Sequence, residues 1–406
     1  MITKIENIGK IATWDIASEK IKIYEKQRLE ILIKDTSIFK ILQGPSRIDY
    51  DKVIDAKGGL VTPGFIDCHT HPIFYDNRDL DFRLRTEGKT YEQISDQGGG
   101  IKSSIDSVRS ASFEQLLNES LPRIELFLKK GTTTIEAKSG YGLTLEDEIK
   151  SLEVIKELNN QSDLDIVPTF MGAHDFPPEY SSNKDAYVDL ICNDMIPEVA
   201  SKKLALFCDV FCEEGYFSVN QSEKILRAGL DYGLIPRLHA DEFVDSGAAS
   251  LAAEIKAVCA DHLMFASDEN LKKMADSNVI SVILPGTTFF LGKKEYVDTN
   301  KISDFGGEIA IASDYNPGSC FIQSMPLIMF LSNLYCNLSI DLSFKACTYN
   351  AAKVLKKENE IGLIQEGYNA DLLIWSLDSL ESIPYAFNNN ESSLLSIIKN
   401  GKSVLL

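Results

Sequence analysis

Short apolar runs recur along the middle of the chain, and most of them end in polar residues. Between them lie stretches whose apolar residues return every three or four positions, the spacing of an amphipathic helix. The runs themselves have the length and composition of buried strands. We therefore expect eight strands, at residues 64–71, 132–138, 166–174, 208–213, 234–240, 257–262, 279–285 and 308–314.

Capping residues mark where several of the helices begin. Thr144 is followed three positions later by Asp147, and Ser218 by Gln221, so a helix is expected after each pair. An earlier helical stretch contains Pro122, which predicts a kink or a break because proline lacks the backbone N–H that a helix needs.

Strands that alternate with helices predict parallel sheet, and eight of them favour a closed barrel over an open sheet. The chain ends differ, because strand-like runs at 20–24, 29–34, 37–42, 394–399 and 403–406 follow one another closely. We expect an α/β protein: a (β/α)8 TIM-like barrel at residues 63–358, and a small β-sandwich domain built from residues 1–62 and 359–406.

Composition narrows the class of partner. The net charge of −19 argues against nucleic acid or an anionic membrane. The first residues lack the apolar core of a signal peptide, and no run approaches the roughly 20 apolar residues that span a bilayer. Eight cysteines without a C-x-x-C pair fit a reducing compartment better than a disulfide framework. We expect a soluble, cytoplasmic protein.

All five histidines fall at or near the ends of predicted strands. His69 and His71 are two positions apart on the first strand, so their side chains should share a face. Two such imidazoles can hold a metal ion, although local hydrogen bonds alone would also explain an isolated pair. The other polar groups at these ends are Lys138 to Tyr141, His174, Glu213, His239, Glu242, His262 and Asp314. Such strand ends form the catalytic face of a barrel.

These motifs resemble those of a known enzyme group. Pro-Gly-Phe-Ile-Asp-Cys-His-Thr-His at 63–71, with His239, His262 and Asp314 on later strands, is similar to the amidohydrolase superfamily. A narrower resemblance, to the imidazolonepropionase family, covers nearly the whole chain. Its motifs are Asn-Arg at 77–78, Gly-Gly-Gly-Ile at 98–101, Lys-Ser-Gly-Tyr-Gly at 138–142, Gly-Ala-His at 172–174, Phe-Cys-Glu-Glu-Gly at 211–215, His-Ala-Asp-Glu at 239–242 and Asp-Tyr-Asn-Pro-Gly-Ser at 314–319.

The resemblance implies a hydrolase that opens the cyclic amide 4-imidazolone-5-propanoate to N-formimidoyl-L-glutamate in histidine degradation. It makes His69, His71, His239 and Asp314 the ligands of one divalent or trivalent metal ion, zinc or iron. Three neutral imidazoles and a carboxylate suit such an ion and leave room for a water molecule. Glu213, at the end of the fourth strand, leaves a second, weaker metal site open.

Catalytic roles follow from the same resemblance. Glu242 would orient or deprotonate the water and move its proton, and His262 would hydrogen-bond the carbonyl oxygen or the water. Which of Glu242, His262 and Asp314 is the general base stays open. Glu242 could instead orient a metal-bound imidazole.

The implied partner is a small molecule with a carboxylate tail. The resemblance places Arg78, Tyr141, His174 and Glu242 against it, with Asn316, Gly318 and Ser319 holding the tail. An ion pair from Arg78 to Asp76 or Asp79 is the plainer interpretation. The glycines at 98–100 lack the pattern of a phosphate-binding loop and suggest a mobile lid. A homodimer is compatible with these features.

Two other functions remain open. Another mononuclear amidohydrolase, such as a cyclic nucleobase deaminase, would share His-x-Asp-Glu on the fifth strand, but Arg78 and Tyr141 speak against it. A non-catalytic barrel protein would usually have lost metal ligands, and here each one is present.

Overall fold

The structure is a computed structural model that describes residues 1–25, 28–89, 93–94 and 97–404. The chain divides into two compact units: residues 1–68, 126–134 and 323–406 form the first, and residues 69–125 and 135–322 form the second. Both chain ends belong to the first unit. All the site residues expected from the sequence belong to the second, so the distances between them are distances within one unit.

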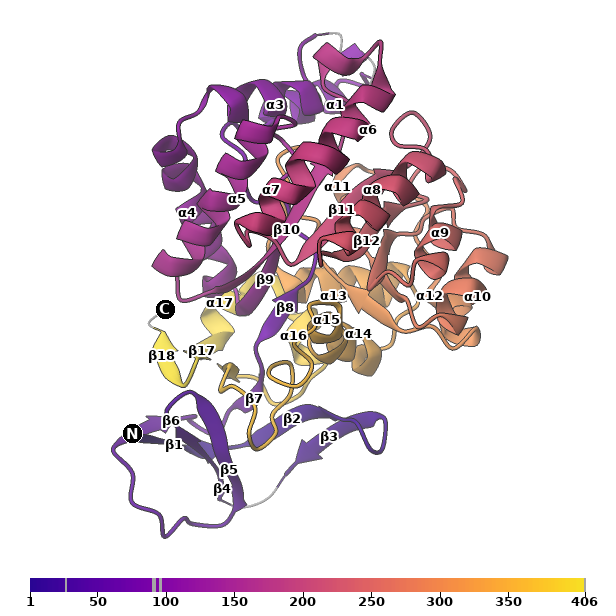
Figure 1. Ribbon diagram of the computed structural model, residues 1–406. Helices are drawn as coiled ribbons and strands as arrows, with labels where there is room; N and C mark the ends of the chain where they lie inside the picture. The colour runs from indigo at the N-terminus through magenta and orange to yellow at the C-terminus, as the bar shows by residue number, and fades with distance from the viewer. Residues whose placement is uncertain (26–27, 90–92, 95–96, 405–406) are drawn as a thin grey trace. The chain divides into compact units, whose positions relative to one another are not determined.

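Eight strands form one sheet in chain order, from β15 through β14, β13, β12, β11, β10 and β9 to β8. Beyond β8, Thr70 makes a parallel bridge with Tyr315, and the N–H of His71 donates to the Tyr315 carbonyl at 2.7 Å. These contacts join the two ends of the sheet, which confirms the predicted (β/α)8 barrel (Figure 1). The strands are β8 (Phe65–Asp67), β9 (Thr132–Lys138), β10 (Asp165–Ala173), β11 (Phe207–Cys212), β12 (Ile235–Ala240), β13 (Cys259–His262), β14 (Ile280–Ile283) and β15 (Ile309–Ile311).

Helices follow the barrel strands along the chain and pack against them; α5 contacts β10, and α8 contacts β11 and β12. The helices of the barrel region are α1 (Asp79–Thr86), α3 (Ile101–Ser110), α4 (Phe113–Lys129), α5 (Leu145–Gln161), η1 (Pro178–Tyr180), α6 (Lys184–Leu190), the π-helix η2 (Ile191–Met195), α7 (Ile196–Ser201), α8 (Val219–Asp231), α9 (Ala248–Glu254), α10 (Asp268–Asp276), α11 (Pro285–Phe290) and α12 (Thr299–Asp304). None of the described helices is long and apolar enough to cross a bilayer.

The predicted caps form. Thr144 accepts the N–H of Asp147 at 3.1 Å, and Ser218 and Gln221 exchange hydrogen bonds in a complete capping box. Pro122 lies inside α4, which runs from Phe113 to Lys129, so the predicted break does not occur.

Two further sheets make the β-sandwich of the first unit. One has four strands in the order β5-β4-β1-β6, and the other has six in the order β18-β17-β16-β7-β2-β3. Apolar side chains of both sheets share one buried core, including Ile5 and Ile31 from the first sheet and Val61, Leu372 and Ile374 from the second. Strands drawn from both ends of the chain therefore bury one another, as the sequence predicted.

The sandwich strands are β1 (Ile2–Ile8), β2 (Lys10–Asp15), β3 (Lys20–Tyr24), β4 (Leu29–Lys34), β5 (Ser37–Gln43), β6 (Lys52–Asp55), β7 (Leu60–Pro63), β16 (Leu372–Trp375), β17 (Leu394–Lys399) and β18 (Lys402–Val404). The helices of the same unit are α13 (Met325–Tyr335), α14 (Ile340–Ala346), α15 (Tyr349–Val354), α16 (Ser382–Tyr385), η3 (Phe387–Asn389) and α17 (Asn390–Ser393).

Gly64 separates β7 from β8, at the position where the sequence predicted the first barrel strand to begin. Before it, β7 pairs with β16 in the sandwich; after it, β8 belongs to the barrel sheet. The N–H of Gly64 donates to the Asp371 carbonyl at 2.8 Å, and a side chain at this position would overlap Thr133. Only glycine fits this junction, and the chain then continues directly to His69.

Candidate metal centre and substrate cavity

Three histidine side chains converge at the carboxyl ends of the barrel strands, His69 and His71 just after β8 and His239 in the last part of β12. Nε2 of His69 and Nε2 of His71 are 3.3 Å apart, and Nε2 of His239 lies 3.4 Å from that of His71. Oδ1 of Asp314 lies 3.5 Å from Nε2 of both His69 and His71. The structure thus brings together the four side chains that the sequence proposed as ligands.

This arrangement fits one metal ion. Four atoms placed tetrahedrally, each about 2.0–2.1 Å from a zinc-like ion, lie about 3.3–3.4 Å from one another, close to the separations found here. Burial lowers the pKa of His69 and of His71 well below the ordinary value, so both rings are neutral. Neutral imidazoles have the free lone pair that a metal needs.

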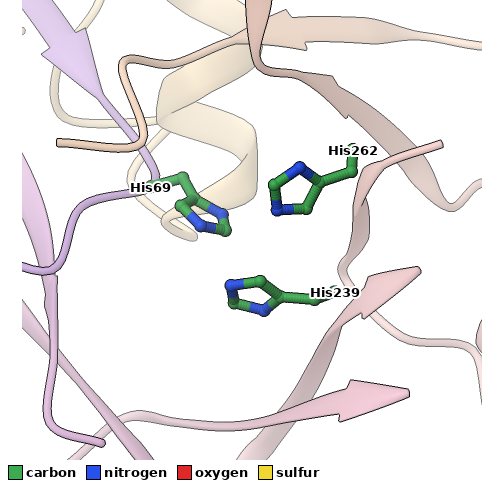
Figure 2. A group of neighbouring side chains, drawn as sticks. All are labelled: His69, His239 and His262. Atoms are coloured by element: carbon green, nitrogen blue, oxygen red, sulfur yellow. The ribbon is translucent and has the colours of Figure 1, made fainter. Parts of the chain in front are cut away.

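Figure 2 shows that His262 also points toward His69 and His239, and these three residues form a second group of potential ligand atoms within 4.8 Å of one another. His262 is therefore near enough to touch anything bound at the centre. The backbone φ of His262 is +77° and that of Asp314 is +54°. Both lie in the left-handed region that residues other than glycine seldom adopt. Such conformations concentrate at functional sites.

Carboxylates behind the ligands orient two of the rings. Nδ1 of His69 lies 2.6 Å from Oδ2 of Asp261, and Nδ1 of His239 lies 3.0 Å from Oδ1 of Asp209. A neutral ring whose Nδ1–H donates a hydrogen bond to a carboxylate presents Nε2 as the acceptor, which is the usual support for a metal-bound histidine. His71 has no such partner for Nδ1 among the described residues.

Two buried cations hold these carboxylates. Lys138 contacts Glu136 and Asp209, each at 2.8 Å, and Arg237 contacts Asp261 at 2.7 Å. All five side chains are fully buried. The sequence analysis missed this layer, apart from naming Lys138 as a strand end. The sequence does contain a sign of this layer, because its charged residues lie inside strands that are otherwise apolar.

Asp314 is held by Thr287, which none of the sequence motifs includes. Its Oδ2 accepts a hydrogen bond from Oγ1 of Thr287 at 2.6 Å, which leaves Oδ1 facing His69 and His71. Burial raises the pKa of Asp314 to about 6.

Glu242 lies beside His262, with Oε2 3.6 Å from Nε2 of that ring. Burial, and secondarily the nearby Asp314 carboxylate, raise the pKa of Glu242 to about 8. This side chain can therefore hold or release a proton near neutral pH, as a general acid or base must. Glu213 is engaged elsewhere: its two oxygens accept the N–H groups of Glu214 and Phe243, each at 2.9 Å.

A cavity of about 550 Å³ opens on the centre. It is lined by His71, Arg78, Asp81, Arg85, Lys89, Ile94, Ile101, Tyr141, His174, Phe211, Tyr216, His239, Glu242, Phe243, His262, Leu291, Lys293, Asp314, Asn316, Gly318 and Ser319. Every residue that the sequence analysis proposed for substrate binding is among them. The volume is in the range of small-molecule sites.

Arg78 forms an ion pair, but with neither residue suggested by the sequence. Its Nε contacts Oδ2 of Asp81 at 2.7 Å, three positions along the chain, instead of Asp76 or Asp79. A side chain on Gly318 would overlap the Arg78 guanidinium, so the guanidinium can keep this position only beside a glycine. Asp81 also accepts the N–H of Gly100 at 3.0 Å, which ties the glycine run at 98–100 to α1.

The loop after β15 is organised by its own asparagine. Oδ1 of Asn316 accepts the N–H groups of Gly318 and Ser319 at 2.9 and 2.7 Å, and Nδ2 donates to the Asp314 carbonyl at 2.7 Å. These bonds fix the loop beside the ligand carboxylate.

The Lys-Ser-Gly-Tyr-Gly loop is held from beneath by Glu148. This buried carboxylate accepts the N–H groups of Gly140, Gly142 and Leu143, at 2.9–3.2 Å. The Gly140 carbonyl lies 2.9 Å from Nδ1 of His174, and because a carbonyl can only accept, that nitrogen carries the proton. Burial lowers the pKa of His174 to about 3, so its ring is neutral.

Solved structures share this architecture. Guanine deaminase from C. acetobutylicum aligns over 100% of this chain and 100% of its own with a TM-score of 0.73, at 15% identity. 5-Methylcytosine deaminase from Klebsiella pneumoniae aligns over 99% of this chain and 97% of its own with a TM-score of 0.74, also at 15% identity. At these identities the likeness is one of fold alone. The amidohydrolase family model matches residues 242–404. Barrel and site together define an amidohydrolase.

The sequence relatives are more specific. A protein named imidazolonepropionase from Brevibacillus brevis is 47% identical over 87% of this chain and 83% of its own length. Another protein of that name, from Thermoanaerobacter pseudethanolicus, is 39% identical over 99% of this chain and 98% of its own. This chain belongs to the imidazolonepropionase family.

Proposed function

We propose that this chain hydrolyses 4-imidazolone-5-propanoate to N-formimidoyl-L-glutamate, the ring-opening step of histidine degradation. The observation that carries the proposal is one cavity lined both by His71, His239 and Asp314 and by Arg78. A substrate with a reactive ring carbonyl and an acid tail requires these two kinds of group together. The family membership agrees with this chemistry.

His69, His71, His239 and Asp314 would hold one metal ion, zinc or iron. Bound there, the ion would polarise the ring carbonyl and lower the pKa of a water molecule. We favour the divalent state. The buried cluster sets four carboxylates, Asp314 and the three behind the ligands, against two cationic side chains. A double positive charge balances this difference, and buried charges are costly unless balanced.

Glu242 takes up the proton of the attacking water and returns it to the departing ring nitrogen. A pKa near neutrality suits a group that acts first as base and then as acid. His262, 3.6 Å from Glu242, steers the carbonyl oxygen toward the centre. Asp314 lies beside the position of the attacking water molecule and assists its attack.

The ring of the substrate lies against Tyr141 and His174. Since His174 is neutral and protonated on Nδ1, it offers Nε2 as an acceptor, which suits a ring N–H of the substrate better than a carboxylate. The carboxylate tail pairs with Arg78, whose planar guanidinium matches the two carboxylate oxygens. The loop is held against that guanidinium by Asn316, Gly318 and Ser319.

The wider setting belongs to the same proposal. We take residues 63–358 as the catalytic domain, because all the proposed site residues fall within it, and residues 1–62 and 359–406 as its β domain. Cys192, Cys208, Cys212 and Cys347 are buried free thiols, which supports a reducing compartment such as the cytoplasm. A homodimer, and the absence of nucleic acid and membrane partners, stay predictions; light scattering of the purified protein tests the first.

A substrate comparison tests the function. Metal-loaded protein is given imidazolone propanoate, the same ring without its tail, and a cyclic nucleobase. We expect ring opening of the first at a kcat/KM at least about 100-fold above the second, the consequence of losing a buried ion pair. Release of ammonia from the nucleobase without ring opening of the imidazolone would make the protein a deaminase instead.

A further inference from the structure

Arg85 also lines the cavity, although nothing in the sequence motifs selected it. It lies near the end of α1, seven residues after Arg78. Its Nη2 donates to the carbonyl of Gly318 at 3.2 Å. Its Nη1 is buried and has no hydrogen-bond partner among the residues that the structure describes.

A buried donor without a partner is unusual, because folding has removed its water and supplied nothing in exchange. A guanidinium makes the case stronger, since the group is charged. The side chain as a whole is only half-buried, so it could have turned toward solvent. Instead the Gly318 carbonyl holds the guanidinium with Nη1 turned away from water.

Arg78 is close by and is constrained in a similar way. Its Nε is taken by Asp81, and its guanidinium packs on Gly318, the residue whose carbonyl holds Arg85. Burial, and secondarily the charge of Arg78, lower the pKa of Arg85. These two cations are held near one another against their repulsion, and the carboxylate of Asp81 pairs with Arg78. The pair can therefore accept one more negative charge.

We propose that Arg85 is a second tail-binding residue: its Nη1 and the terminal nitrogens of Arg78 together hold the carboxylate of the substrate. This inference rests on the proposed function. It makes Arg85 a determinant of selectivity for acid-bearing rings, because its buried Nη1 gains a partner when a carboxylate enters. Gly318 serves both arginines, since it gives Arg78 space and anchors Arg85.

The alternative is that Arg85 has only a structural role and holds the Gly318 loop in place. The two roles differ in what the loss of Arg85 affects. Loss of a structural residue displaces Asn316 and Asp314 and lowers turnover of every substrate. Loss of a tail-binding residue raises KM for the acid-bearing substrate and leaves a tail-free ring unaffected.

The test is Arg85→Gln, compared with Arg83→Gln. Arg83 lies on the same helix with its side chain 76% exposed and pairs only with Glu87 among the described residues, so its loss removes the same charge from α1 but not from the cavity. We expect Arg85→Gln to lower kcat/KM for imidazolone propanoate by about 10- to 100-fold, mainly through KM, because Arg78 still holds part of the tail. Its kcat for the tail-free ring should stay within about twofold of wild type, and Arg83→Gln should match wild type on both.

A binding measurement separates this inference from the proposed function. Propanoate is titrated calorimetrically into the zinc-loaded wild type and both variants. Weaker propanoate binding in Arg85→Gln alone supports the tail site, even if the wild type fails to open the imidazolone ring and the proposed function falls. Equal propanoate affinity in all three proteins, or an equal loss of activity on tailed and tail-free rings, overturns it.

Discussion

Replacing Asp261 by Asn should weaken metal binding without touching a ligand. Oδ2 of Asp261 lies 2.6 Å from Nδ1 of His69 and 2.7 Å from Nη2 of Arg237. Asparagine can keep an oxygen there, but a neutral one. Charge-assisted bonds contribute about 1.5–3 kcal/mol and neutral ones about 0.5–1.5, so each contact weakens by roughly 1 kcal/mol.

The free energy lost at these two contacts can appear as lower folding stability or as weaker metal binding. If most of it weakens the hold on His69, the affinity for zinc falls by about 10- to 100-fold, the range typical of residues that hydrogen-bond a metal ligand. Arg237 loses one charged partner but keeps Glu136 and Asp209 within 3.5 Å, so the metal-free protein is also destabilised, by roughly 1 kcal/mol. Competition with a chelator measures the first effect, and urea unfolding of the metal-free protein measures the second.

Asp371→Asn is the matched control. Asp371 is a buried carboxylate that contacts Nζ of Lys399 at 2.7 Å and the N–H of Asn400 at 2.8 Å, in the other unit. Its loss should destabilise the protein in the same way and leave zinc affinity unchanged. If Asp261→Asn binds zinc within twofold of wild type, or if both variants lose affinity equally, then Asp261 does not act through His69 and the reasoning fails.

The remaining predictions concern the ligands, the proton and pH. His239→Ala should lose most bound metal and all hydrolysis, measured by metal analysis and a ring-opening assay; full occupancy at a normal rate would refute the ligand set. Glu242→Gln should retain metal and fold but lose about 10²-fold or more in kcat, and an unchanged kcat would give the proton to His262 or Asp314. Burial raises the pKa of Asp175 from 3.8 to about 6, so folding stability should fall as pH rises across that window and level off above it, by up to about 3 kcal/mol. Asp175→Asn should reduce that fall by up to about 3 kcal/mol in urea unfolding at pH 4 and pH 7, while Asp314 and Glu242, whose pKa values burial also raises, keep their own contributions; a fall of equal size in the variant would exclude Asp175 as a source.

The positions of the candidate ligands could be predicted because one general rule of the barrel fold determines them. Parallel strands in a barrel end on the same face, so histidines at separate strand ends meet whatever the details between them. His69 and His239 are 170 positions apart and still converge. The barrel and the sandwich could be predicted from periodicity for a similar reason, since an element that is buried on one face or on two has a regular pattern of apolar residues in the sequence.

The supports around the site could not be predicted, because they depend on contacts between side chains distant in sequence. Thr287 meets Asp314 across 27 positions, and Arg237 meets Asp261 across 24. The partner of Arg78 was misjudged for a local reason: α1 begins at Asp79, and the helical turn brings Asp81 beneath the guanidinium. Without a helix start signal at that point, nothing distinguished it from Asp76 or Asp79.

Hydrolysis of the ring carbonyl is the central claim, and an isotope measurement tests it most directly. The zinc-loaded protein opens 4-imidazolone-5-propanoate in water enriched in oxygen-18, and the product is analysed by mass spectrometry. We expect N-formimidoyl-L-glutamate carrying a single solvent oxygen, located in the carboxylate formed from the ring carbonyl and absent from the carboxylate of the tail. A metal-loaded protein that leaves the imidazolone intact, or a product without solvent oxygen in the new carboxylate, would contradict the account.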